Sequence, residues 1–166
     1  MKISEKVQSA INNQLSNELY SSYLYLSMSA HFESANFKGF AKWMRNQAQE
    51  ELMHAMKLYD YLVRRSGRVQ LKAIEAPKNS WASPVQVFEE AYEHEMKVSQ
   101  MINDLVQLAL TEKDYATENA LQWFVNEQVE EEDTANDIVS KLRLIGDDKS
   151  NLLLLDRELG MRSSAE

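Results

Sequence analysis

The sequence predicts an all-α protein: a four-helix bundle with one long crossover connection and a short C-terminal fifth helix. The chain holds only four glycines and two prolines in 166 residues, which favours long uninterrupted helices over a β-sandwich or barrel. Its 44% apolar and 27% charged residues are typical of a globular protein. A chain of this length corresponds to one domain, so we interpret residues 1–166 as a single unit.

Helix signals divide the chain into four long segments of similar length and one short segment. Ser4 is a plausible N-cap of the first, and Ser83 followed by Pro84 marks the start of the third. Gly67 and Gly146 are expected to end the second and the fourth. The expected ranges are 4–34, 37–66, 84–112 and 115–145, followed by 149–159, which ends at Gly160.

The connection over residues 68–83 is long for a compact domain and contains Pro77, Asn79 and Ser80. A helix of thirty residues is about 45 Å long, and sixteen extended residues reach about 55 Å. The connection can therefore cross the whole length of the bundle, which predicts two helix hairpins joined by one crossover.

Charge and composition exclude several functions. A net charge of −8 disfavours a nucleic-acid partner and suits the collection of cations. The absence of cysteine excludes disulfides, thiolate metal sites and cysteine nucleophiles. No apolar stretch is long enough for a membrane span, and the N-terminus lacks the apolar region of a signal peptide, so we expect a cytoplasmic protein without a membrane partner.

The expected core stripe of each long helix is interrupted near its middle by a carboxylate or an amide. One such residue usually sets the register of a bundle or lies at the edge of a stripe, but four at similar depth are harder to explain in that way. The interval between the residues of the first two helices equals that of the last two, at 33 positions. The residues are Glu18, Glu51, Glu95 and Gln128, with His54 and Glu131 three positions after the second and the fourth.

Carboxylates without partners are expensive in a bundle core, at several kcal/mol each. No lysine or arginine lies on these stripes at the same level, whereas a multivalent cation can balance several oxygens at once. Oxygen ligands with one imidazole suit Fe²⁺, Mn²⁺ or Zn²⁺, and Glu51 and His54 share one helix face. The pattern is typical of bundle proteins that bind two metal ions, although the second half has Gln-x-x-Glu in place of Glu-x-x-His.

At these residues the chain resembles the non-haem bacterial ferritins, and the resemblance covers essentially the whole sequence. The strings that carry it are NELYSSYLYLSMSAHF, EELMHAMKLYDYLVRRSGRV, FEEAYEHE and WFVNEQVEEE. The resemblance implies a first iron held by Glu18, Glu51 and His54, and a second held by Glu51, Glu95 and Glu131 with Gln128 beside them.

The resemblance also implies a third iron site near the pair, formed by Glu50, Glu127 and Glu130 and possibly sharing Glu131. Tyr25 corresponds to the tyrosine near the diiron centre of the family and is the expected catalytic side chain, able to hydrogen-bond a ligand or give an electron; packing alone is the other interpretation.

As a function, the resemblance implies iron storage. Fe(II) would be oxidised by dioxygen at an intrasubunit diiron centre, and the ferric product would be deposited as a mineral inside a hollow homo-oligomer. The implied cage has 24 subunits in octahedral symmetry, with the fifth helix pointing inward along the four-fold axes. Glu118, early in the fourth helix, is the best candidate to line an iron channel at the three-fold axes.

The sequence differs from three related families of bundle proteins. Bacterioferritins place a haem-ligating methionine directly after the second-helix glutamate, where this chain has Leu52, so we expect no haem. Rubrerythrin-like proteins need cysteine ligands, and starvation-type mini-ferritins lack a fifth helix and build their site between subunits.

Two other functions stay open at the level of sequence. One is a diiron or dimanganese oxidoreductase acting on a different substrate, such as an oxygenase or a catalase, which would need a substrate pocket. The other is a structural cage subunit that only nucleates mineral, a class marked by the loss of several centre ligands.

Overall fold

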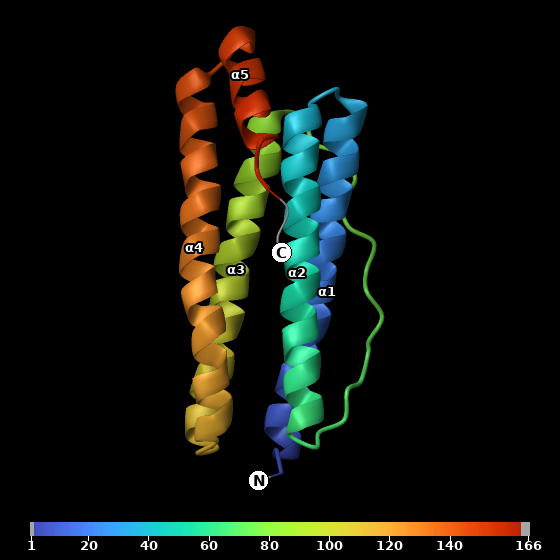
Figure 1. Ribbon diagram of the computed structural model, residues 1–166, viewed down its shortest axis with the longest axis vertical. Helices are drawn as coiled ribbons and strands as arrows, with labels where there is room; N and C mark the ends of the chain where they lie inside the picture. Colours follow the sequence, from blue (N-terminus) through green and yellow to red (C-terminus); the bar gives the residue numbers. More distant parts are fainter. Residues whose placement is uncertain (1, 164–166) are drawn as a thin grey trace.

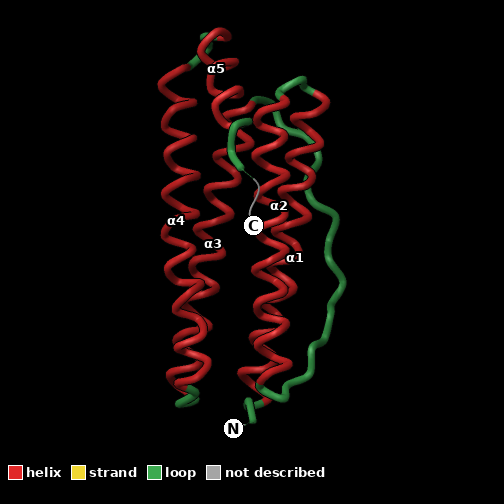
Figure 2. Tube along the Cα trace, viewed as in Figure 1, coloured by secondary structure: helices red, strands yellow, loops and turns green. Residues whose placement is uncertain are grey.

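The computed structural model describes residues 2–163, and within this range it contains five helices and no strand (Figures 1 and 2). The long helices α1 and α2 form one antiparallel hairpin, and α3 and α4 form the other. The expected all-α bundle with a short fifth helix is confirmed. The helices are α1 (Glu5–Ser34), α2 (Lys38–Arg64), α3 (Pro84–Thr111), α4 (Tyr115–Ile145) and α5 (Lys149–Leu159).

Side-chain caps begin three of the long helices where the sequence predicts a start. The Ser4 hydroxyl accepts from the Val7 amide at α1, and the Ser83 hydroxyl accepts from the Gln86 amide at α3. Asp114 accepts from the Thr117 amide at α4 in the same way. These bonds satisfy backbone donors that the first turn of a helix otherwise leaves without partners.

The end of α2 differs from the prediction, since the helix stops at Arg64, before Gly67. Ser66 carries the left-handed conformation, with φ of 54°, that usually falls to glycine. Gly67 follows it, and its amide donates to the Leu62 carbonyl at 2.9 Å. A Cβ on Gly67 would lie 3.2 Å from Ile3, so close packing favours a small residue there.

The connection between α2 and α3 runs along the outside of α1 over the length of the bundle, as predicted (Figure 1). Buried Asn12 fixes one end, because its side chain donates to the Arg68 carbonyl at 2.9 Å and accepts from the Gln70 amide at 2.8 Å. Farther along, the Ser27 hydroxyl donates to the Lys78 carbonyl at 2.6 Å. Side chains of α1 therefore hold the backbone of the connection against the bundle by hydrogen bonds.

The two hairpins pack unevenly. α1 lies against α3, whereas no Cα atom of α2 comes within 8 Å of one in α4. At the upper end in Figure 1, α5 packs against α2 and α4. Gly39 makes this approach possible, because a Cβ there would lie 1.6 Å from the Asp156 carbonyl oxygen. The Asp156 carboxylate in turn accepts from the Phe40 amide at 2.8 Å.

Candidate metal centre

A polar layer divides the apolar core at mid-height. One buried apolar cluster gathers around Phe32, Phe40 and Phe88, and a separate one gathers around Ile11 and Leu62. Between them lie all six side chains that interrupt the predicted core stripes, each no more than 7% exposed. They come from all four long helices: Glu18 from α1, Glu51 and His54 from α2, Glu95 from α3, and Gln128 and Glu131 from α4.

The carboxylates and the imidazole form overlapping groups with the spacing of metal ligands. In each group, one ligand atom per residue lies within 4.8 Å of the others. The groups share residues, since Glu51, His54 and Glu131 each belong to two of them. The groups are Glu18, Glu51 and His54; Glu51, Glu95 and Glu131; and His54, Glu127 and Glu131.

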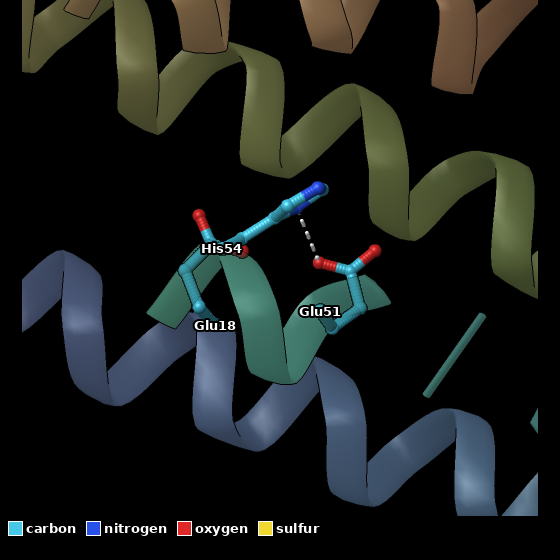
Figure 3. A group of neighbouring side chains, drawn as sticks. All are labelled: Glu18, Glu51 and His54. Atoms are coloured by element: carbon cyan, nitrogen blue, oxygen red, sulfur yellow. Dashed lines mark ion pairs between the residues drawn. The ribbon is translucent and has the colours of Figure 1, made fainter. Parts of the chain in front are cut away.

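The close-up in Figure 3 shows the first group, in which α2 presents two ligands from one face opposite α1. His54 Nδ1 lies 3.2 Å from an oxygen of Glu51, as the three-residue spacing predicts. Burial lowers the pKa of His54 to about 4, with a smaller contribution from Lys57. The imidazole is therefore neutral at pH 7, in the form that binds a metal. The Trp123 ring packs edge-on at 5.3 Å.

Burial raises the pKa of every glutamate in the layer. The pKa of Glu18 rises to about 7 and that of Glu131 to about 8, and those of Glu51 and Glu95 also rise. Among the described residues, no lysine or arginine forms an ion pair with any of these four. Glu18 Oε2 is buried without a hydrogen-bond partner. An orphaned oxygen within an oxygen-rich donor set is what a divalent cation such as Fe²⁺ would satisfy.

A shell of uncharged donors orients these carboxylates. Gln14 donates to Glu18 at 2.8 Å. Gln47 donates to Glu131 at 2.6 Å and to Glu51 at 3.2 Å.

Sequence reasoning missed both glutamines, although each is buried and lies four residues before a ligand glutamate on the same helix face. That repeated spacing is the signal that could have found them.

Tyr25 and Gln128 both contact Glu95. The buried Tyr25 hydroxyl donates to one Glu95 oxygen, and Gln128 Nε2 donates to the other at 3.1 Å. The pKa of Tyr25 is raised well above its ordinary value, by burial first and then by the glutamate charges, so the phenol keeps its proton. In this arrangement Gln128 lies beside Glu95 as expected and serves as its hydrogen-bond donor.

The residues expected around a third ion are not gathered in one group. Glu127 faces His54 Nε2 at 3.8 Å, Glu50 forms an ion pair with Arg162 at 2.6 Å, and Glu130 is exposed. Arg162 is a further residue that sequence reasoning missed, because it lies in the polar tail beyond α5. The third site stays a prediction.

Comparison with known proteins shows the family of the chain. The family described as "Ferritin-like domain" matches residues 8–145, a span that includes every side chain of the polar layer. The chain belongs to the ferritin family. Non-haem ferritins are iron-storage ferroxidases. The family of the chain therefore confirms the ferroxidase expected from the sequence.

Relatives match over nearly the whole chain. A bacterial non-heme ferritin of Bacteroides fragilis is 48% identical, covering 96% of this chain and 99% of its own length. A probable bacterial non-heme ferritin-like protein of Haemophilus influenzae is 42% identical over 98% of both chains. A solved structure of an engineered closed form of the Archaeoglobus fulgidus ferritin has a TM-score of 0.98 and 55% identity, covering 99% of this chain and all of that one.

Proposed function

We propose that this ferritin oxidises Fe(II) to Fe(III) with dioxygen at a diiron centre within each subunit and stores the product as a ferric mineral inside a hollow cage. The observation that carries the proposal is the convergence of four buried carboxylates and one imidazole, all from one chain. No second subunit is needed to complete the ligand set.

Two of the three overlapping ligand groups assign the ions. Glu18, Glu51 and His54 hold one Fe²⁺, and Glu51, Glu95 and Glu131 hold the other, with Glu51 between them. Each ion loses one electron, so dioxygen gains two electrons together and a one-electron oxygen radical is avoided. The protein contributes positioning and charge balance.

Gln128 and Tyr25 affect the charge and the geometry around the second ion through their contacts with Glu95. A neutral amide in place of a fifth carboxylate lowers the negative charge around this ion, which favours release of the ferric product to the store. The Tyr25 phenol is the catalytic side chain of the proposal: it holds Glu95 by a hydrogen bond and lies close enough to the layer to give an electron.

The apolar surface supports assembly into a cage. Leu144, Leu153 and Leu154 are 88%, 58% and 62% exposed, an arrangement that a lone subunit would place in water. We propose 24 copies, with Glu118 lining an iron channel and a cytoplasmic location. Among the described residues, no helix is long and apolar enough to cross a membrane.

Stopped-flow absorbance tests the proposal. Anaerobic protein loaded with Fe²⁺ and mixed with dioxygen should oxidise about two irons per chain in a fast phase, followed by sustained mineral growth. Glu51→Ala and His54→Ala should each slow the fast phase by at least ~10-fold, since each removes a ligand. Glu93→Ala, an exposed acid two residues before Glu95, is the matched control and should change nothing.

The same experiment separates the two alternatives. A subunit that only nucleates mineral would show no fast phase, and normal kinetics in both ligand variants would contradict the centre. An oxidoreductase with another substrate would consume dioxygen without mineral growth. A mass measurement that found only monomers or dimers would contradict the cage.

A further inference from the structure

The residues after α5 fold back onto α2, beside the candidate centre. In Figure 1 the coloured chain runs down from α5 beside α2. Asn46 on α2 holds this segment through its backbone, because its side-chain amide donates to the Arg162 carbonyl at 3.3 Å and to the Ser163 carbonyl at 3.5 Å. The position of Arg162 is thus set by its main chain as well as by its side chain.

Three further side chains of α2 receive the Arg162 guanidinium. It pairs with Glu50 at 2.6 Å, donates to Gln47 Oε1 at 2.9 Å and lies over the Trp43 ring at 4.8 Å. Together with Asn46, these residues lie within two turns of α2 at the three- and four-residue spacings of one helix face. Arg162 and Glu50 are both largely shielded, with side chains 23% and 20% exposed.

Arg162 also decides which way the Gln47 amide points. A guanidinium can only donate hydrogen bonds, so it holds the oxygen of Gln47 toward the tail. The amide nitrogen must then face the centre, where it donates to Glu51 and Glu131. The tail therefore contacts the ligand carboxylates through a single intervening side chain.

The ion pair lies beside the centre, on the side of α2 that faces α4. A shallow pocket of about 350 Å³ opens between α2 and α4, lined by Glu50, Met53, His54, Lys57, Trp123 and Glu127. Glu50 and Glu127 are two of the three acids that the resemblance implies for a third iron. The Glu50 oxygen 2.6 Å from a guanidinium nitrogen already has a cationic partner, so a metal ion binding there must compete with Arg162.

We propose that Arg162 is a tethered counter-ion of Glu50. The Arg162 guanidinium must leave Glu50 before a third iron can bind beside the diiron pair. The inference rests on the proposed function, since the third iron would bind beside the proposed diiron centre. Arg162 is a positioning residue in this scheme: it holds Glu50 and Gln47 and touches neither the two ions nor dioxygen. The third position would fill only when ferrous iron outcompetes the tail.

Anaerobic calorimetric titration with Fe²⁺ alone tests the proposal without relying on catalysis. The parent protein should bind two ions tightly and a third weakly. Arg162→Gln should bind the third ion roughly tenfold more tightly, equivalent to about 1.4 kcal/mol, because Glu50 loses its competing cation. Arg157→Gln removes the same charge from an exposed position in α5 and should titrate like the parent.

A double variant shows whether the gain runs through Glu50. In Arg162→Gln with Glu50→Gln the added affinity for the third ion should disappear, while the two tight ions remain. Equal third-ion affinity in Arg162→Gln and the parent would overturn the proposal, and so would a gain that persists in the double variant. Absence of the two tight ions from the parent would instead overturn the proposed function, and this inference with it.

Discussion

Glu51 is the residue whose pKa is affected by the charges of all the other glutamates in the polar layer. Its pKa is raised well above the ordinary value by burial first, and then by the charges of Glu95, Glu18 and Glu131. Without a cation these four carboxyls cannot all be ionised at neutral pH, so they hold protons. Binding of two divalent ions would replace those protons, which makes ion affinity rise with pH.

Tyr25→Phe separates the chemical role of the phenol from its packing. The variant keeps the ring in the core but removes the donor to Glu95, so two Fe²⁺ should still bind while their oxidation slows by roughly tenfold. Anaerobic titration measures binding, and stopped-flow absorbance measures oxidation. A variant that oxidises iron at the parent rate would assign the hydroxyl to packing.

The buried acids of the polar layer could be predicted because each breaks an apolar stripe. Glu18, Glu51, Glu95 and Glu131 interrupt runs of core residues, and burial of the runs forces burial of the acids. The glutamines that orient them gave a weaker signal, the four-residue spacing before Glu18 and Glu51. A buried glutamine such as Gln47 is an ordinary helix former, and its role depends on a neighbour in another helix that only the fold supplies.

At the scale of the elements, the short fifth helix depends on one close approach. The α2 backbone at Gly39 meets the α5 backbone at Asp156, and no larger residue fits between them. The sequence predicted both helices but not this contact, because nothing in a local pattern shows which helix face another will meet. Arg162 escaped prediction for the same reason, since it follows Gly160 where helical periodicity has ended.

Gly39→Ala should undock α5. The added Cβ would overlap the Asp156 carbonyl, which costs about 1–3 kcal/mol and lowers Tm by roughly 5 °C. Circular dichroism measures the transition. Ser66→Gly, at the other end of α2, is the contrasting control: it relieves a left-handed serine and should leave Tm unchanged or raise it. Equal Tm values for Gly39→Ala and the parent would contradict the close contact.

At the scale of the whole molecule, the polar layer makes the stability of the metal-free protein depend on pH. The folded-state pKa values of Glu18 and Glu131, about 7 and about 8, lie above their ordinary value of 4.5. These groups bind more protons in the folded than in the unfolded chain, so their stabilising contribution is lost as pH rises through the folded pKa. His54 and His94, with pKa values lowered to about 4, oppose this trend only below about pH 6.5.

The metal-free protein should therefore lose stability between pH 6.5 and pH 8. One carboxyl that stays protonated in the folded protein through this interval lowers the free energy of unfolding by roughly 2 kcal/mol. This loss corresponds to a Tm lower by roughly 5 °C. Differential scanning calorimetry of chelator-treated protein measures the change. Protein loaded with a redox-inert divalent ion should show a much smaller dependence, and identical slopes with and without the ion would contradict the assignment of the buried acids.

The two ends of the chain differ in what can be attached to them. The N-terminal residues lie at one tip of the bundle (Figure 1), whereas Asn46 of α2 donates to the Ser163 carbonyl. An affinity tag fused after Glu166 would follow closely on a segment that α2 holds by hydrogen bonds from Asn46. Purification handles and cargo peptides therefore belong at the N-terminus.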